Sequence, residues 1–281
     1  MAMPDRRLPQ IEAVASMLAR EVDGSRAGLP ADAGTARGGD TPSARPAASI
    51  DDGPGWGSRG SASGTPADTP CLPARRGLFI TLEGPDGCGK TTQMQRLERC
   101  LRRRGFSVEC TREPGGTPLA EAIRRLLLEP RYGVVDARAE ILLYAAARAQ
   151  HVAERIRPAL AAGKIVLCDR FTDSTIAYQG YGRRLGLELV RQVNELATGG
   201  LTADLTLLID VPVAVGLARR GQGAADRLEQ EDLTFHRRVR QGYLELSRQE
   251  PQRVRLIDGT RSSDAVWSQI AAAVAPLLGP A

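Results

Sequence analysis

Residues 77–92 read GLFITLEGPDGCGKTT, and this stretch decides the fold. Residues 84–91 within it match the phosphate-binding pattern G-x-x-x-x-G-K-[ST] in full. The preceding run, residues 77–83, has the apolar, β-branched and aromatic composition of a buried strand. Apolar residues recur at helical spacing through residues 91–104. We therefore expect a strand, a phosphate-binding loop and a helix whose N-terminus faces an anion.

The loop contains Lys90, one of only two lysines among 38 Lys and Arg residues, the other being Lys164. A compact, mobile ammonium can reach phosphate oxygens inside a tight loop, whereas a planar guanidinium fits that space poorly. Gly84, Gly87 and Gly89 supply the turn and the bare N–H groups that bind an anion. The alternative is a glycine-rich turn without a ligand.

Composition separates an N-terminal extension from one folded domain in the chain of 281 residues. Residues 1–73 are rich in Ala, Gly, Pro, Ser, Asp and Arg, so we expect a disordered extension. This extension lacks the apolar core of a secretory signal, so we do not expect export. Its many acidic residues argue against an organelle transit peptide. An over-long gene model is a further alternative for residues 1–73. Residues 77–281 form the predicted nucleotide-binding domain.

Charge and cysteine content narrow the classes of partner. The net charge is +5, but aromatic residues make up only 4% and no basic stripe interleaved with aromatics is present, so we expect nucleotides rather than nucleic acid. The five cysteines include no C-x-x-C pair, which favours reduced thiols in the cytoplasm. No apolar run is long enough to span a membrane, and we expect a soluble protein.

Strand and helix patterns alternate after residue 77, which indicates an α/β fold: a five-stranded parallel sheet with helices on both faces. The expected strands are 77–83, 106–111, 164–168, 205–210 and 253–257. The expected helices begin at 91, at Thr117-Pro118, at 136 (running to 162 with a bend at Pro158), at 185, 212, 232 and 264. Ligands of such sheets bind at the carboxyl ends of the strands.

Polar residues follow the second and third strands. The segment 111–117, TREPGGT, places a charged pair before a helix N-terminus, with a surface salt bridge as the alternative. Asp169 and Arg170 follow the third strand, where a Mg²⁺-linked carboxylate and a phosphate-binding arginine are expected; a buried ion pair between them is the alternative. The segment 174–180, STIAYQG, offers a wall for a base and a sugar.

Two further segments carry candidate site residues. Tyr144 and Arg148 share a helix face, so a ring and a guanidinium could grip a planar ligand, although core plus surface packing is the commoner reading. His151 has no partner carboxylate within reach in the sequence and is interpreted as structural. Residues 219–227 form a basic, glycine-containing loop that could close over a phosphoryl group; an ordinary connection between helices is the alternative.

Together these motifs resemble thymidylate (dTMP) kinase of the bacterial type, in order and spacing, from about residue 77 to the C-terminus. The matching segments are the phosphate loop, TREPGGT at 111–117, LLYAAARAQH at 142–151, DRF at 169–171, AYQG at 177–180, LLIDVP at 207–212 and DRLE at 226–229.

The resemblance implies a P-loop NTPase fold, transfer of the γ-phosphoryl group of ATP to dTMP, Mg²⁺ as cofactor and a homodimer. The implied residues fall into four groups. The ATP phosphates are held by Gly84, Pro85, Asp86, Gly87, Cys88, Gly89, Lys90, Thr91 and Thr92. Mg²⁺ is held by Thr91 and Asp169. The dTMP residues are Asp86, Glu113, Tyr144, Arg148, Arg170, Thr175, Tyr178 and Gln179. Catalytic charge comes from Lys90, Arg170 and the lid residues Arg219, Arg220 or Arg227.

Two other functions remain open on the sequence. One is a P-loop kinase for a different deoxynucleotide, and the other is a nucleotide-binding switch without catalysis. The presence of both a phosphate loop and an acceptor-side set of arginines argues against the switch.

Overall fold

The computed structural model describes residues 77–220 and 225–278. The predicted disordered extension over residues 1–73 lies outside the described residues, and so do residues 221–224 of the predicted lid. None of the helices within the described ranges is long and apolar enough to cross a membrane.

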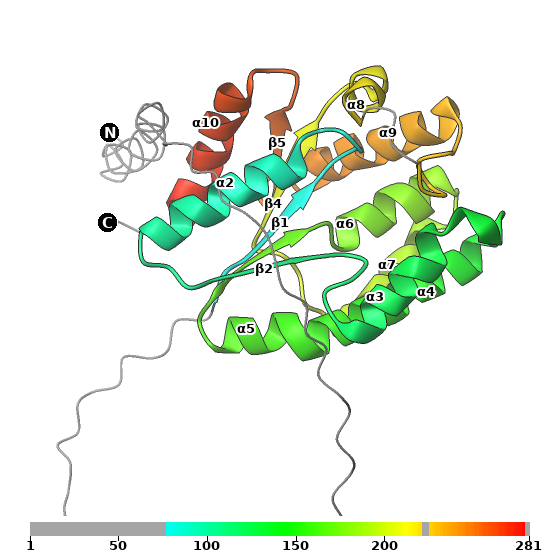
Figure 1. The fold of residues 1–281 in the computed structure, drawn as a ribbon, viewed down its shortest axis with the longest axis horizontal. Coiled ribbons are helices and arrows are strands. Elements are labelled where there is room, and N and C mark those ends of the chain that lie inside the picture. Colours follow the sequence, from blue (N-terminus) through cyan, green and yellow to red (C-terminus); the bar gives the residue numbers. More distant parts are fainter. Residues whose placement is uncertain (1–76, 221–224, 279–281) are drawn as a thin grey trace, which may run out of the picture. The chain divides into compact units, whose positions relative to one another are not determined.

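Five parallel strands form one sheet, in the spatial order β2-β3-β1-β4-β5. The order places β1, which leads into the phosphate loop, at the centre (Figure 1). The strands are β1 Phe79–Glu83, β2 Val108–Arg112, β3 Ile165–Asp169, β4 Leu205–Asp210 and β5 Val254–Asp258. Each lies within two residues of its predicted start and end.

Helices cover both faces of the sheet, as the alternating pattern predicts. The α-helices are α2 Lys90–Arg103, α3 Pro118–Leu128, α4 Ala137–His151, α5 Arg157–Ala161, α6 Thr172–Thr175, α7 Leu187–Thr198, α8 Val213–Arg220, α9 Leu233–Gln249 and α10 Ser263–Val274. Short 3₁₀ turns span Pro130–Tyr132 and Ala275–Leu277. Alternate residues of β1 pack on opposite sides: Ile80 and Leu82 join the core beneath α2 and α10, and Phe79 joins the core beneath α5.

Two segments depart from the predicted helices. The expected helix over 136–162 is interrupted before Pro158, because residues Val152–Ile156 form a π-helical turn between α4 and α5. Pro158 has no N–H to donate to the preceding turn, and its ring crowds that turn, so the ladder widens there. The predicted base-and-sugar wall is also helical: α6 continues into a second π-helical segment, Ile176–Gly182. π-Helical turns recur at functional sites.

The carboxyl ends of β1, β2 and β3 meet at one edge. Leu82 lies opposite Asp169, and the Arg170 N–H donates to the Leu82 carbonyl at 3.0 Å. The Glu113 N–H donates to the Asp169 carbonyl at 2.9 Å. The residues after these three strands are therefore held side by side by backbone hydrogen bonds.

The phosphate loop also packs tightly against α8. A Cβ atom added to Gly216 would lie 2.4 Å from the Asp86 carbonyl oxygen, and one added to Gly87 would lie 2.0 Å from the Gly216 carbonyl oxygen. Both distances are far inside van der Waals contact. The backbones of the loop and of α8 can approach this closely only because both positions are glycine.

We predict that Gly216→Ala lowers the free energy of unfolding by about 1–3 kcal/mol, because the added methyl group must displace the loop. A glycine-to-alanine change in an open helix position has the opposite sign. Urea titration measures the change. Gly186→Ala is the matched control, since its Cβ would meet nothing within 4 Å. A Gly216→Ala protein as stable as the Gly186→Ala protein would contradict the prediction.

Candidate active site

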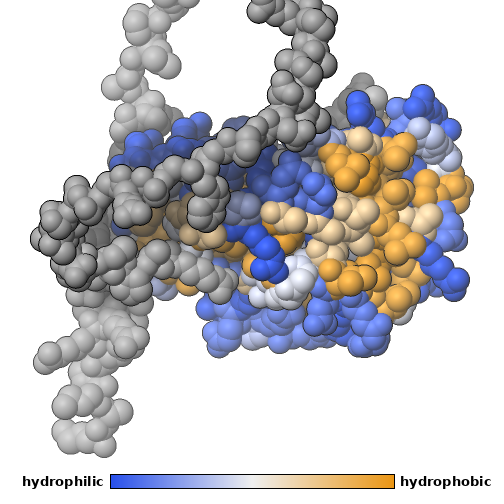
Figure 2. Space-filling view, turned by 90° about the horizontal axis from the view of Figure 1, so that it is seen from below, coloured by the Kyte–Doolittle hydropathy of each residue, from blue (hydrophilic) through white to orange (hydrophobic). Residues whose placement is uncertain are grey.

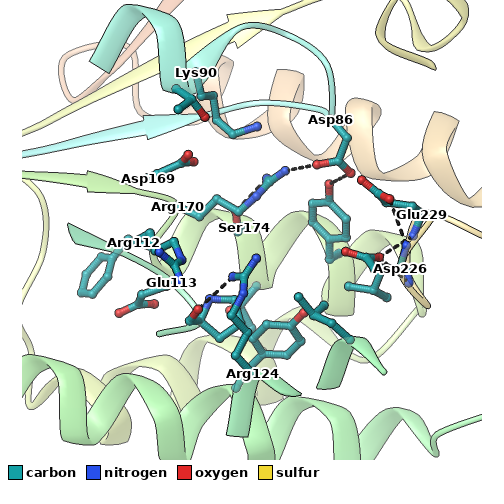
Figure 3. Close-up of a pocket in the computed structure, with 18 of the residues that line it drawn as sticks. Asp86, Lys90, Arg112, Glu113, Arg124, Asp169, Arg170, Ser174, Asp226 and Glu229 are labelled. Atoms are coloured by element: carbon teal, nitrogen blue, oxygen red, sulfur yellow. Dashed lines mark hydrogen bonds and ion pairs between the residues drawn. The ribbon is translucent and has the colours of Figure 1, made fainter. Parts of the chain in front are cut away.

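A cavity of about 470 Å³ opens at the carboxyl edge of the sheet. Figure 3 shows Arg170 reaching across its middle toward Asp86, with Lys90 on one side and Arg124 on the other. Most of the predicted site residues line it: Asp86, Gly87, Gly89, Lys90, Thr91, Thr92, Glu113, Tyr144, Arg148, Asp169, Arg170, Thr175, Tyr178, Gln179 and Arg219. The cavity therefore joins the phosphate loop to the segments after β2 and β3.

The phosphate loop has the conformation that its glycines predict. Gly84, Gly87 and Gly89 adopt φ angles of 137°, 73° and 97°, a region that favours glycine. Lys90 is 8% exposed, and its ammonium donates to the loop carbonyls of Gly84 and Pro85 at 3.1 and 3.2 Å. Its donors are thus held next to the α2 N-terminus, where backbone N–H groups favour negative charge. Cys88 is buried beneath the loop and does not line the cavity.

Arg170 is held by four side-chain hydrogen bonds at the middle of the cavity. Its Nη1 donates to the Gly84 carbonyl at 3.0 Å and to the hydroxyls of Ser174 and Tyr243 at 3.3 and 3.0 Å. Its Nη2 pairs with Asp86, and its guanidinium lies 5.2 Å from the centre of the Tyr178 ring. Asp86, rather than the neighbouring Asp169, is therefore the ion-pair partner of Arg170.

Asp86 is ionised in this arrangement. Burial favours its neutral form, but the charges of Arg170 and Lys90 and a hydrogen bond from the Tyr178 hydroxyl outweigh burial and lower its pKa to about 2. The Tyr178 hydroxyl donates to Asp86 at 2.9 Å. A carboxylate held in this way can orient two neighbours, the guanidinium and the phenol, throughout the neutral pH range.

Asp169 has one carboxylate oxygen without a partner. Its Oδ1 is buried and accepts no hydrogen bond from the part of the chain that the structure describes. A buried carboxylate oxygen in a native protein normally has a partner. Asp169 and Thr91 both line the cavity, so an ion or an ordered water between them would satisfy this atom.

Glu113 connects the cavity to a buried ion-pair network. Its Oε2 accepts from Arg148 Nε at 2.7 Å, and its Oε1 lies 2.9 Å from His151 Nδ1. The expectation that His151 has no partner carboxylate is wrong. The fold places the end of α4 against the end of β2, and the two residues are 38 positions apart in the sequence, so no local pattern could indicate the pair. His151 Nε2 also lies 2.6 Å from the Thr111 hydroxyl. Arg112 and Glu113 do not pair with each other, which was the alternative for this segment: Arg112 pairs with Glu121 at the surface.

Arg148 is held rigidly at the cavity wall. Besides Glu113, it donates to Asn194 Oδ1 at 2.8 Å and to the Phe171 carbonyl at 3.1 Å, and it is 2% exposed. Tyr144 lies one turn earlier on α4 and lines the same cavity. The predicted pairing of an aromatic ring and a guanidinium on one helix face is present.

Thr175 presents an unused hydrogen-bonding group. It is 2% exposed, lines the cavity, and its Oγ1 has no hydrogen-bond partner within the described ranges. Gln179, on the same wall, donates to Glu140 at 2.8 Å. A ligand with a polar edge directed at Thr175 would satisfy the orphaned hydroxyl.

The three lid arginines have different environments. Arg219 lines the cavity and donates to the Gly259 carbonyl at 2.8 Å. Arg220 ends α8, and its side chain lies outside the described part. Arg227 is 7% exposed and is not among the described residues that line the cavity; it donates to the Leu127 carbonyl at 2.8 Å and to Glu140 at 2.6 Å.

Two cavity residues lie outside every segment that the sequence singled out, namely Arg124 and Leu128. Other lining residues lie in such segments but had no individual role assigned: Arg112, Pro114, Phe171, Ser174, Asp226, Leu228 and Glu229. Arg124 lies on α3 and donates to the Pro114 carbonyl at 2.9 Å. Its position seven residues after the Thr117 N-cap repeats the helix face that meets the TREPGGT turn, and this spacing is the only sequence signal for it.

Glu83, which ends β1, lies behind this set. Its carboxylate accepts from the Phe171 N–H at 2.7 Å, from Ser174 at 2.6 Å and from Tyr243 at 3.0 Å. Burial and the charge of Asp173 raise its pKa to about 7, against the opposing effects of Arg170 and these hydrogen bonds. Its position immediately before the phosphate loop carried no local signal of this role.

We predict that Arg227→Ala lowers the free energy of unfolding by about 3 kcal/mol, because it leaves Glu140 buried with one guanidinium removed. Glu140 is 0% exposed and keeps Arg183 as its second partner. Chemical denaturation measures the loss. The matched control is Arg219→Ala, whose side chain is exposed, with an expected change below about 1 kcal/mol. Equal losses in the two variants would contradict a buried anchoring role for Arg227.

Comparison with known proteins agrees with this geometry. A family model described as thymidylate kinase matches residues 82–270. The thymidylate kinase of Deinococcus radiodurans is 56% identical over 202 residues, covering 71% of this chain and 97% of that protein. The thymidylate kinase of Syntrophotalea carbinolica is 56% identical over 200 residues, covering 69% and 93%. A crystal structure of thymidylate kinase from Ehrlichia chaffeensis matches with a TM-score of 0.53 and 39% identity, covering 64% of this chain and 92% of that chain. The chain belongs to the thymidylate kinase family.

Proposed function

We propose that the protein transfers the γ-phosphoryl group of ATP to dTMP and releases ADP and dTDP. The observation that carries the proposal is that one cavity joins a complete phosphate loop to a wall where Arg170, Arg148 and the orphaned Thr175 hydroxyl converge. A switch that only binds a nucleotide would need the phosphate loop and not the second wall with its arginines. Neither the structure nor the comparisons offer an observation that favours a different monophosphate.

On the donor side, the loop N–H groups and Lys90 bind the phosphates of ATP. The described residues contain no group of three or more His, Cys, Asp or Glu that could hold a metal ion by themselves. Mg²⁺ commonly uses one or two protein ligands together with substrate phosphates, and the unpaired Asp169 Oδ1 and the Thr91 hydroxyl fit that requirement. When bound, Mg²⁺ neutralises the charge that develops on the transferring group.

On the acceptor side, Arg170 binds the phosphate of dTMP. Its guanidinium is already fixed by Asp86, Gly84, Ser174 and Tyr243, so little side-chain entropy is lost when phosphate arrives. Proteins catalyse phosphoryl transfer mainly by positioning the acceptor oxygen in line with the γ-phosphate and by stabilising the charge electrostatically.

The base and the sugar meet the π-helical wall. Thr175 accepts from the thymine N3–H, Arg148 donates to a thymine carbonyl, and Tyr144 stacks on the ring. Tyr178, which its bond to Asp86 holds in place, stands against C2′ and disfavours a ribose hydroxyl. Asp86, Glu113 and Gln179 complete the polar edge around the sugar.

The arginine that stabilises the transition state comes from α8 and the lid. Arg219 is the strongest candidate, because it lines the cavity, and Arg220 follows it in the chain. Arg227 anchors the segment after the lid to Glu140 and would have to leave that buried pair to reach a phosphate.

The proposal is tested by steady-state turnover with ATP, Mg²⁺ and a panel of monophosphates. We expect dTMP to be preferred and dTDP to be the product, with dUMP, dCMP and dGMP slower. Lys90→Met should lower kcat by at least about 10³-fold, equivalent to about 4 kcal/mol of transition-state stabilisation, without unfolding the protein. Absence of ADP formation with dTMP would refute the activity, and a preference for dCMP or dGMP would refute the specificity.

The protein is also proposed to act as a homodimer in the cytoplasm. Three adjacent helices expose leucines on one face: Leu119 and Leu126 on α3, Leu142 on α4, and Leu189 and Leu196 on α7. Figure 2 shows a broad hydrophobic surface on that side of the molecule. Leu142 is 61% and Leu196 85% exposed, and apolar surface of this extent is characteristic of a protein interface. Free thiols at Cys88 and Cys168 fit a reducing compartment.

We predict that sedimentation velocity gives the mass of a dimer for the wild-type protein and the mass of a monomer for Leu142→Glu. A charge placed at the centre of an apolar interface would be buried without a partner. Leu256→Glu is the control, because Leu256 is 52% exposed on β5, outside this surface. A monomeric wild-type protein at micromolar concentration would contradict the homodimer.

A further inference from the structure

Glu83 is a fully buried carboxylate that the mechanism above does not use. It is 0% exposed, ends the central strand β1 and immediately precedes the phosphate loop. It does not line the cavity, so it cannot touch either substrate directly. Three donors nevertheless converge on it, all from segments that build the acceptor side.

One of these bonds fixes the backbone of Arg170. Arg170 adopts a φ of 71°, a left-handed conformation that costs energy for any residue other than glycine. The next residue, Phe171, donates its N–H to Glu83 Oε1 at 2.7 Å. The bond therefore stabilises the turn that projects Arg170 into the cavity.

The other two bonds fix the side chain of Arg170. The hydroxyls of Ser174 and Tyr243 donate to Glu83 Oε2 at 2.6 and 3.0 Å, and the same hydroxyls accept from Arg170 Nη1 at 3.3 and 3.0 Å. The two hydroxyl oxygens also lie 2.7 Å from each other. A hydroxyl that donates its single proton to Glu83 keeps its lone pairs for the guanidinium. Glu83 is therefore the shared acceptor that orients this pair of hydroxyls toward Arg170.

The charges around Glu83 favour this role. From the segment after β3 it faces Arg170 and Asp173, and from α9 it faces Tyr243. Asp173 forms a bidentate ion pair with Arg253 at 2.7 and 2.8 Å, and its negative charge still raises the pKa of Glu83. Arg170, which also pairs with Asp86, is the cation whose charge opposes that rise. The pKa of Glu83 is raised to about 7, so the carboxylate is ionised, and acceptor-only, in the weakly alkaline range.

We propose that Glu83 is a positioning residue for the acceptor phosphate: through Phe171, Ser174 and Tyr243 it holds Arg170 in the orientation that binds the phosphoryl group of the acceptor. This inference rests on the proposed function, because it takes dTMP as the acceptor. It adds a residue that touches neither substrate yet controls the group that does.

The test compares dTMP with thymidine, which lacks the phosphate, in calorimetric titrations of wild-type protein and Glu83→Gln at pH 8. Glutamine keeps the size of the side chain but presents an N–H to the two hydroxyls. We expect dTMP to bind about tenfold more weakly, the equivalent of one hydrogen bond to a charged group, while the affinity for thymidine changes less than twofold.

Tyr243→Phe provides a second variant, which removes one bridging hydroxyl and keeps the buried ring. Tyr243→Phe should also weaken the binding of dTMP and leave that of thymidine unchanged. The loss of dTMP binding free energy in the double variant should be smaller than the sum of the two single losses, because both residues act on one network. Glu109→Gln is the control: Glu109 lies on β2, away from the cavity lining, and pairs with Arg155 and Lys164. It should change neither affinity.

If Glu83→Gln and Tyr243→Phe lowered the affinities for dTMP and thymidine by equal factors, the site would be generally damaged and the proposal would be overturned. Unchanged dTMP affinity in both variants would overturn it too. Failure of the proposed function is a separate result, namely a wild-type protein that forms no dTDP from dTMP and ATP.

Discussion

The placement of one guanidinium, that of Arg170, is the constraint on which the site depends. Parallel pairing puts the ends of β1 and β3 side by side, so the residue after β3 lies against the phosphate loop. Asp86 of that loop then pairs with Arg170, and the loop carbonyl of Gly84 accepts from it. The donor and acceptor halves are thereby built on a common set of hydrogen bonds.

The two halves use different cations for physical reasons. Lys90 donates to the loop carbonyls of Gly84 and Pro85 and contacts Cys88 Sγ at 3.7 Å, and no carboxylate pairs with it among the described residues. Its ammonium is a point charge on a flexible stem. Arg170 is fixed by a carboxylate, a carbonyl and two hydroxyls, and behind them by Glu83. A chain that uses Arg almost everywhere keeps Lys where a mobile point charge has to follow phosphates, and it uses Arg where a planar fork has to be held in place.

Much of the architecture could be predicted, because local patterns carry it. All five strands, the phosphate loop and the Thr117 N-cap follow from periodicity, glycine placement and capping chemistry. The π-helical turns did not follow. Residues 152–156 have ordinary helical composition, and residues 176–182 contain two glycines, which disfavour a helix, so local composition indicates a π-helical turn in neither segment. Many residues of the cavity were predicted from the phosphate loop and from their places after the strands, and the resemblance to thymidylate kinase added others, such as Tyr144, Arg148 and Arg219.

The side-chain pairings were the part that local reasoning missed. Arg170 pairs with Asp86 and not with the adjacent Asp169, His151 meets Glu113, and Arg227 meets Glu140. Each pair joins elements that are distant in the sequence, so it is fixed by the topology of the sheet and not by spacing. Glu83 escaped notice for the same reason, since its three donors come from three separate positions after β3 and on α9.

The central claim is that the acceptor site is organised by the protein itself, before ATP contributes anything. Isothermal titration of dTMP into the protein, with and without a non-hydrolysable ATP analogue, tests it most directly. The account predicts one dTMP per chain in the absence of the analogue, with an affinity within about tenfold, or 1.4 kcal/mol, of that in its presence. Binding of dTMP only after the analogue has been added would contradict it.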